Sequence, residues 1–166
     1  MEIKTPYIII RGPLGIGKST ISKELAKQLK AKRISLDDLL QKNKLDDLDE
    51  KEGCIPAKNF IKVDNLILDE VKFNLEKGKI IIFDGCFYHK EQIKHLEKKL
   101  GKALVFNLKA PLSVCINRDS NRNKIFGKEA AKAVYKLVSK FDYGINIYTN
   151  NKTPKETIKE ILSYIK

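Results

Sequence analysis

Two hydrophobic periods alternate along the chain and predict a regular succession of strands and helices. Short, unbroken apolar runs rich in β-branched residues predict strands that are buried on both faces. Apolar residues spaced three and four positions apart predict amphipathic helices between them. Strands are expected at 7–11, 33–36, 79–84, 103–108 and 145–148, and helices at 18–30, 60–76, about 93–100, from 111 past 122, 128–141 and from 154.

This alternation predicts an α/β fold, a three-layer sandwich in which a five-stranded parallel sheet carries helices on both faces. A length of 166 residues predicts one domain spanning 1–166. The polar, acidic stretch 41–59 interrupts the pattern and is predicted to be a mobile insertion. Ligands of such sheets bind beyond the carboxyl ends of the strands, which is where we expect the site.

The segment GPLGIGKS at 12–19 is a complete G-x-x-x-x-G-K-[ST] phosphate-binding loop, which marks a P-loop NTPase fold. A predicted strand precedes it and a predicted helix follows, which is the context that this loop requires. Its glycines let successive backbone N–H groups face phosphate oxygens, the lysine reaches the β- and γ-phosphates, and the serine hydroxyl can ligate Mg²⁺. The predicted nucleotide-binding residues here are Gly12, Pro13, Leu14, Gly15, Ile16, Gly17, Lys18, Ser19 and Thr20.

Two carboxylates follow predicted strands. Asp84 ends the hydrophobic run at 80–83, as in a Walker B strand, and is predicted with Ser19 to hold Mg²⁺. Asp37 follows the second strand and is predicted to accept the proton of an attacking hydroxyl. The alternative role for Asp37 is a helix N-cap, and because Asp38 is adjacent, one of the two can cap while the other catalyses.

Two of the four arginines, Arg118 and Arg122, fall in one R-x-x-x-R window. This spacing predicts that they share a helix face and grip phosphoryl oxygens, as catalytic residues that neutralise charge on the transferring group. The residues that follow, 123–127, complete a predicted lid at about 118–128. The structural alternative is an exposed pair of like charges, which would be slightly destabilising.

The formal net charge of +12, from 33 basic and 21 acidic residues, would suit a polyanionic partner, but nearly all the basic residues are lysines spread along helix faces. Nucleic acid therefore stays a possible partner beside a generic solvated surface. The three cysteines have no metal-ligand spacing, and neither His89 nor His95 pairs with them in sequence, so we expect reduced thiols. No signal-peptide or membrane-spanning stretch is evident, and we expect a cytoplasmic protein without a membrane partner.

Together these residues resemble the small P-loop kinases of the polynucleotide 5′-hydroxyl kinase, zeta-toxin and chloramphenicol-phosphotransferase group. The resemblance implies that Asp37 is the catalytic aspartate and that Arg118 and Arg122 belong to the lid. It also implies that the last strand and loop, 145–152, border the adenine, with Asn150 and Lys152 as nucleotide-binding residues. One departure is Leu40, where polynucleotide kinases of this kind carry a basic residue that holds a 3′-phosphate.

A second segment, APLSVCINRD at 110–119, is similar to the lid segment of adenylylsulfate kinases, although the other motifs of that family are missing. We interpret it as shared lid architecture without a shared substrate. The expected activity is ATP- and Mg²⁺-dependent phosphoryl transfer to a hydroxyl of a small molecule, a nucleotide or a nucleic acid. The alternative is a P-loop ATPase or nucleotide-dependent switch that transfers no phosphoryl group.

Overall fold

The computed structural model describes residues 7–122 and 126–165. Within these ranges, five parallel strands form one sheet in the order β2-β3-β1-β4-β5, which confirms the predicted fold class. The central strand β1 leads directly into the phosphate loop, so the loop starts at the carboxyl end of the middle strand of the sheet. The strands are β1 (Tyr7–Arg11), β2 (Lys32–Ser35), β3 (Ile81–Gly85), β4 (Leu104–Lys109) and β5 (Ile145–Tyr148).

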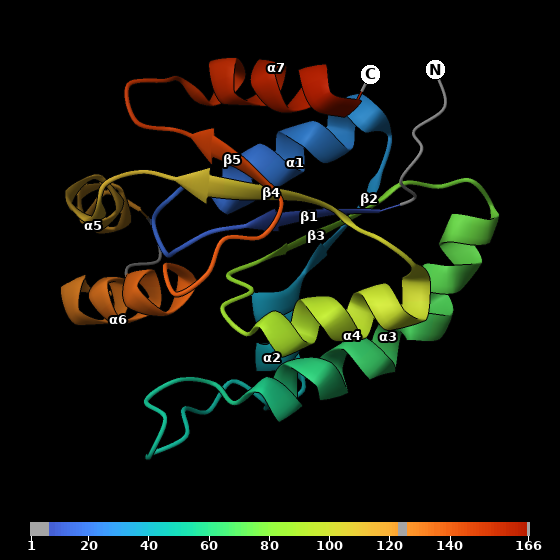
Figure 1. The fold of residues 1–166 in the computed structure, drawn as a ribbon, viewed down its shortest axis with the longest axis horizontal. Coiled ribbons are helices and arrows are strands. Elements are labelled where there is room, and N and C mark those ends of the chain that lie inside the picture. The colour runs from blue at the N-terminus through green and yellow to red at the C-terminus, as the bar shows by residue number, and fades with distance from the viewer. Residues whose placement is uncertain (1–6, 123–125, 166) are drawn as a thin grey trace.

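Helices cover both faces of the sheet (Figure 1). Helices α1 (Lys18–Leu29) and α7 (Pro154–Ile165) pack on one face, and α2 (Leu36–Lys42), α3 (Ala57–Glu76) and α4 (Lys90–Leu100) pack on the other. Alternate residues of β1 supply the two cores: Ile8 and Ile10 face α1 and α7, whereas Tyr7 and Ile9 face α3 and α4. Each face is therefore closed by its own apolar cluster.

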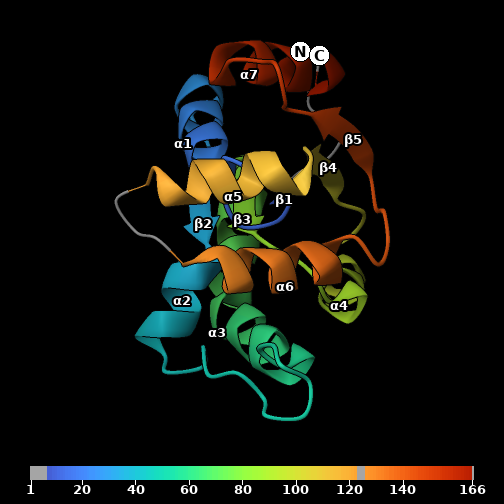
Figure 2. The ribbon, with the colours of Figure 1, turned by 90° about the vertical axis from the view of Figure 1, so that its left-hand side faces the viewer.

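The remaining helices, α5 (Leu112–Ser120) and α6 (Lys128–Val138), lie across the end of the sheet where the strands finish. Figure 2 looks onto this end and shows α5 between α1 and α6. The phosphate loop and the segments after β2, β3 and β5 open toward the same end. The fold thus brings the chemistry-bearing segments together, as the strand order requires.

Several predicted boundaries were wrong in detail. Helix α3 begins at Ala57, directly after Pro56, and α2 is helical through Lys42, so the predicted insertion 41–59 is a shorter connection over 43–56. Its mobility stays a prediction. Helix α5 ends at Ser120, so Arg122 lies beyond the helix, and α6 ends at Val138 instead of 141.

A buried arginine explains why α6 stops early. Arg11, at the end of β1, is fully buried and donates from Nη2 to the carbonyl of Val138 (2.9 Å) and from Nη1 to that of Phe141 (3.1 Å). It also donates to the Asn107 side chain, and its guanidinium lies 4.1 Å from the centre of the Phe141 ring. Burial lowers the pKa of Arg11 to about 10, so the group remains charged at neutral pH. Arg11 anchors the end of α6 to the sheet.

The last helix begins as the sequence predicts. Thr153 and Glu156 form a reciprocal capping box: the Thr153 N–H donates to Glu156 Oε2 (2.7 Å), and the Glu156 N–H donates to Thr153 Oγ1 (3.2 Å). Within the described ranges, no helix combines the length and apolar character needed to cross a membrane.

Candidate active site

The phosphate loop depends on glycine at two positions with positive φ. Gly17 caps α1 with φ 105°, and Gly15 has φ 79°. A Cβ on Gly15 would lie 2.2 Å from the carbonyl oxygen of Cys115, so α5 approaches the loop too closely for any side chain there. The loop is therefore shaped by its backbone and by the neighbouring helix.

Lys18 is the first residue of α1 and is buried. Its ammonium group donates a hydrogen bond to the carbonyl of Pro13 (2.8 Å), which holds the side chain across the loop. An ammonium in this position can move to phosphate oxygens without leaving the loop. The geometry suits the predicted contact with β- and γ-phosphates.

Asp84 lies one residue before the end of β3, and two side chains that the sequence did not single out hold it. Arg33 of β2 donates to Asp84 Oδ2 at 2.5 Å, and Ser22 of α1 donates to the same oxygen at 2.7 Å. Arg33 also donates to Ser22 Oγ. The predicted Walker B carboxylate is thus oriented by an ion pair from the neighbouring strand, and Arg33 and Ser22 contact the same carboxylate oxygen.

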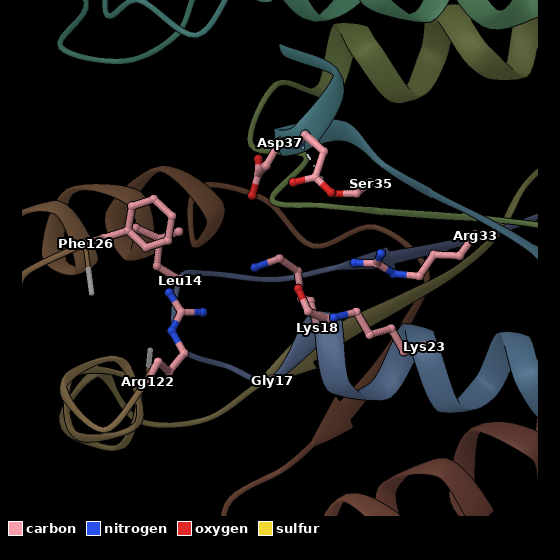
Figure 3. Close-up of a pocket in the computed structure, with 11 residues that line it drawn as sticks. Leu14, Gly17, Lys18, Lys23, Arg33, Ser35, Asp37, Arg122 and Phe126 are labelled. Carbon is pink, nitrogen blue, oxygen red and sulfur yellow. Dashed lines mark hydrogen bonds between the residues drawn. The ribbon is translucent and has the colours of Figure 1, made fainter. Parts of the chain in front are cut away.

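A cavity of about 250 Å³, which Arg33 lines but Asp84 does not, is called here the Asp37 cavity. Figure 3 shows Lys18 and Arg122 pointing into it from one side and Asp37 from the other. Its lining residues are Leu14, Gly17, Lys18, Ser19, Lys23, Arg33, Ser35, Asp37, Asp38, Arg122 and Phe126.

The helix that presents Asp37 is capped by a different residue. Ser35 is the N-cap of α2, and its hydroxyl accepts the Asp38 N–H (3.4 Å). Asp37 and Asp38 both lie in the first turn, where the helix dipole stabilises negative charge. The N-cap alternative for Asp37 is therefore wrong, and its carboxylate faces the cavity instead.

Arg122 does not share a helix face with Arg118, because α5 ends before it. It pairs with the buried carboxylate of Asp119 (2.8 Å), and its guanidinium stacks 5.2 Å from the centre of the Phe126 ring. The same carboxylate accepts the Gly127 N–H (3.1 Å), so Asp119 holds both sides of the predicted lid. Residues 123–125 of the lid lie outside the described ranges.

The Arg122 Nε atom is buried and has no hydrogen-bond partner in the described structure. Leaving a buried donor unpaired costs free energy that a ligand oxygen would recover. Arg122 is therefore the arginine placed to receive an additional anion.

Arg118 lies on a helix, as predicted, but its guanidinium contacts the phosphate loop and the segment after β5. Its Nη1 donates to the carbonyl of Ile16 (3.1 Å) and to Thr149 Oγ1 (2.9 Å), and its Nη2 donates to the carbonyl of Thr149 (3.0 Å). These bonds tie the phosphate loop to the end of β5. The expectation that Arg118 and Arg122 form one guanidinium pair on a helix is wrong.

A second cavity, of about 320 Å³, lies on this side and is called the Thr149 cavity. Its walls come from the phosphate loop, α1, α5 and the segment after β5: Gly15, Ile16, Gly17, Thr20, Ile21, Arg118, Arg122, Thr149, Lys152, Pro154 and Thr157. Lys152 lines it and pairs with Glu160 (2.5 Å), whereas Thr149, one residue before the predicted Asn150, supplies the wall.

Gly17 and Arg122 line both cavities, so the two spaces meet at the phosphate loop. Sequence reasoning missed Ser22, Arg33 and Asp119, whereas Thr149 falls within the range 145–152 that was predicted to border the adenine. The rarity of arginine in the chain was a signal for Arg33. Cys86, which interacts with Lys18, Asp37 and Asp84, is buried beside the junction, and burial raises its pKa to about 11.

Comparison with known proteins assigns the family. A family described as an AAA domain matches residues 8–135, so the chain belongs to that family. The shikimate kinase of Francisella tularensis subsp. holarctica (strain FTNF002-00 / FTA) is 38% identical over 89 residues, which cover 50% of this chain and 46% of the relative. The chain thus matches about half the length of the curated relatives.

Solved kinase structures share the whole fold at low identity. A sugar kinase from Janibacter sp. HTCC2649 superimposes with a TM-score of 0.73 at 15% identity, covering 96% of this chain and 94% of that one. A gluconokinase from Sinorhizobium meliloti 1021 gives a TM-score of 0.69 at 13% identity, covering 99% and 93%. These likenesses identify a kinase-type P-loop fold; membership of the polynucleotide kinase and zeta-toxin group stays a prediction.

Proposed function

We propose that the protein is an ATP-dependent kinase that transfers the γ-phosphoryl group to a hydroxyl of a small molecule. The observation that carries the proposal is the junction of the two cavities at Gly17 and Arg122, with Lys18 and Asp37 facing one another beyond it. The Thr149 cavity would take the nucleoside and the Asp37 cavity the acceptor. The γ-phosphoryl group would then lie at the junction.

Asp37 accepts the proton of the acceptor hydroxyl as its oxygen attacks the γ-phosphorus. The new O–P bond forms while the bond to the β–γ bridging oxygen breaks, and ADP leaves with that oxygen. Lys18 and Arg122 stabilise the negative charge on the transferring group, and the unpaired Nε of Arg122 gains a partner. Arg118 acts one step away, by fixing the phosphate loop against the Thr149 cavity.

A magnesium ion fits the donor set near the loop, because Ser19 offers a hydroxyl and Asp84 a carboxylate, both hard oxygen ligands. Since Arg33 and Ser22 occupy Oδ2 of Asp84, Oδ1 is the atom we propose for the ion or its water. When bound, the ion supplies charge neutralisation at the β- and γ-phosphates. Arg33 keeps the Asp84 carboxylate in place for it.

Three features favour a small acceptor over a nucleic acid. The Asp37 cavity is compact, and Leu40, at the position of the 3′-phosphate contact in polynucleotide kinases, is fully buried. Relatives and solved structures with this fold include a shikimate kinase, a gluconokinase and a sugar kinase. Among small acceptors, Lys23 and Arg33 in the cavity lining favour one that bears a carboxylate or phosphate.

The direct test is transfer of the γ-phosphate from labelled ATP across shikimate, sugars, sugar acids, nucleosides, RNA and DNA. We expect product with a small acidic acceptor and little ATP consumption without an acceptor. Steady ATP hydrolysis with no phosphorylated product in any reaction would instead support a nucleotide-dependent switch.

The same panel tests the nucleic-acid alternative through salt dependence. Oligonucleotide binding that weakens with a log–log salt slope of about −0.7 per phosphate contact, together with 5′-end phosphorylation, would make the protein an end-processing kinase. Weak binding, independent of oligonucleotide sequence and unaccompanied by transfer, supports the small-molecule proposal.

A further inference from the structure

A second cluster of chemistry-bearing side chains lies away from the phosphate loop, where the connection 43–56 meets the segment after β3. Cys54 Sγ lies 3.8 Å from Glu52 Oε2 and 4.0 Å from His89 Nε2, and the three ligand atoms all lie within 4.8 Å of one another. Cys54 is buried, His89 is partly buried and Glu52 is exposed. The fold thus joins a cysteine and a histidine that the sequence separates by 35 positions.

The backbone around the cluster is ordered by specific hydrogen bonds. Asp49 Oδ1 accepts the N–H groups of Lys51 and Glu52 (2.9 Å each), and the Asp49 N–H donates to the carbonyl of Cys54 (2.8 Å). These bonds close residues 49–54 into a compact turn. The turn presents the side chains of Glu52 and Cys54 on the same side.

The partner segment is anchored to the same turn. The Tyr88 hydroxyl accepts the Ile55 N–H (3.1 Å), and His89 Nε2 donates to the Ile55 carbonyl (2.7 Å). Phe60 packs edge-on against the rings of Tyr88 and His89, with centroids 5.4 and 5.7 Å apart. The imidazole is therefore held toward Cys54 from two sides.

We propose that Glu52, Cys54 and His89 form a zinc-binding site. Thiolate, imidazole and carboxylate are the ligands that zinc takes in proteins, and they are poor ligands for Mg²⁺ as a set. With bonds of about 2.3 Å to sulfur and 2.0–2.2 Å to nitrogen and oxygen, a tetrahedral zinc separates its ligand atoms by roughly 3.3–3.7 Å. The two Cys54 spacings of 3.8 and 4.0 Å lie close to these values. The third pair lies within 4.8 Å, so Glu52 and His89 approach one another as His89 turns from the Ile55 carbonyl to the ion.

Binding has a defined proton balance. Cys54 loses its thiol proton to solvent and binds as thiolate, and Glu52 binds as carboxylate. His89 stays neutral: its proton moves from Nε2 to Nδ1, and the bond to zinc replaces the hydrogen bond to Ile55. Two anionic ligands compensate the dication, and solvent on the exposed Glu52 side fills the fourth position.

The consequence is a link between the two segments that border the acceptor side. The connection 43–56 follows α2, whose first turn carries Asp37, and His89 follows β3, which ends beside Asp84. Zinc would hold these segments together without contacting the reacting atoms. The site is separate from the Ser19 and Asp84 oxygens proposed for magnesium.

The experiment measures zinc affinity by calorimetry on metal-free protein in buffer containing Mg²⁺, and the absorption spectrum after loading with Co²⁺. We expect one zinc ion per chain and a thiolate-to-cobalt charge-transfer band, which oxygen ligands alone do not give. Cys54→Ser should abolish the band and weaken zinc binding by about 100-fold or more, and His89→Gln should weaken binding similarly. Glu52→Gln, at an exposed position with no folding risk, should weaken it by about 10-fold.

Matched controls are Cys115→Ser, His95→Gln and Glu50→Gln, each of which changes the same residue type outside the cluster and should leave affinity and spectrum unchanged. The absence of stoichiometric zinc binding would overturn the proposal. So would a Co²⁺ spectrum without the thiolate band, or equal affinities of Glu52→Gln and Glu50→Gln. These readouts need no enzyme activity, so they stand apart from the proposed kinase function.

Discussion

The proposed nucleotide side and the proposed acceptor side of the site are built in different ways. On the nucleotide side, one contiguous segment forms a backbone cradle, and glycine torsions together with the Arg118 bonds to Ile16 and Thr149 fix its shape. On the acceptor side, Lys23, Arg33 and Asp37 come from three separate elements and meet only in the folded protein. A backbone cradle suits a ligand part common to every ATP-dependent enzyme, whereas a wall of side chains can change with the acceptor.

This difference has an energetic counterpart. Lys18, on the nucleotide side, is held by a neutral carbonyl that it can exchange for phosphate at small cost. Arg33, on the acceptor side, is held by the mostly buried carboxylate of Asp84, and breaking that pair would leave a charge without its partner. We therefore expect substitutions on the nucleotide side to act on ATP itself, and those on the acceptor side to act on transfer.

The largest effect is expected from Lys18→Ala, which should abolish ATP turnover while the fold survives. The change removes the buried cation placed for the β- and γ-phosphates. Turnover and circular dichroism spectra measure the two properties. Lys27→Ala is the matched control, because Lys27 is an exposed lysine of the same helix that lines neither cavity. Near wild-type turnover in Lys18→Ala would contradict the interpretation of the loop.

Asp37→Asn should reduce phosphoryl transfer by about 10²-fold or more and leave ATP affinity almost unchanged. The amide keeps the shape of the side chain but does not accept the proton. Transfer assays measure the rate, and nucleotide titrations measure ATP affinity. A loss of rate alone would separate the role of the acceptor side from that of the nucleotide side.

Asp38→Asn is the control for that substitution, since it removes the same charge from the same helical turn. Asp38→Asn should reduce the rate of phosphoryl transfer much less than Asp37→Asn does. If Asp38→Asn has the large effect and Asp37→Asn the small one, the catalytic aspartate lies one position later than proposed.

Closure of the lid should couple the two sides. We predict that the amides of Asn121, Arg122, Phe126 and Gly127 exchange faster without nucleotide than with a bound ATP analogue, because Arg122 gains a phosphate partner when the analogue binds. Hydrogen exchange with and without the analogue measures this. Arg122→Ala should lose the added protection, whereas protection that is equal in both states would contradict the lid assignment.

What could be predicted from the sequence follows the same division. The sheet, the phosphate loop and the capping box at Thr153 depend on local patterns, and the structure agrees with them. The ion pair of Arg33 with Asp84, the anchoring of α6 by Arg11 and the contact of Cys54 with His89 depend on residues far apart in sequence. Spacing carries no signal for such contacts, because tertiary packing creates them.

Arg122 illustrates the limit most directly. An R-x-x-x-R spacing places two arginines on one face only if the helix continues, and α5 ends at Ser120, two residues before Arg122. The ion pair with the buried Asp119 then directs Arg122 to the junction of the cavities. The R-x-x-x-R spacing singled out Arg122. Its position at the junction of the cavities depends on the end of α5 at Ser120, which the spacing does not predict.

The last prediction concerns stability, and not activity, in the helical layer behind the acceptor side. Asp64 of α3 is fully buried, and its Oδ1 accepts a hydrogen bond from Gln92 of α4 (3.2 Å), while its Oδ2 has no partner in the described structure. Burial raises the pKa of Asp64 to about 8. The folded protein therefore keeps this proton at neutral pH, whereas the unfolded chain, with an ordinary carboxyl pKa of about 3.9, has released it.

The sign of the pH dependence follows from proton binding. Between pH 4 and 8 the folded state binds the additional proton, so Asp64 makes the free energy of unfolding fall as pH rises, by up to about 1.4 kcal/mol per pH unit, and the fall ends near pH 8. In Asp64→Asn the buried group is neutral throughout, and this contribution disappears. Urea denaturation at several pH values, with Asp69→Asn on the exposed side of α3 as control, measures the difference. A slope in Asp64→Asn equal to that of the wild type would contradict the assignment, and a flatter one would locate a pH-sensitive carboxyl in the layer that supports the acceptor side.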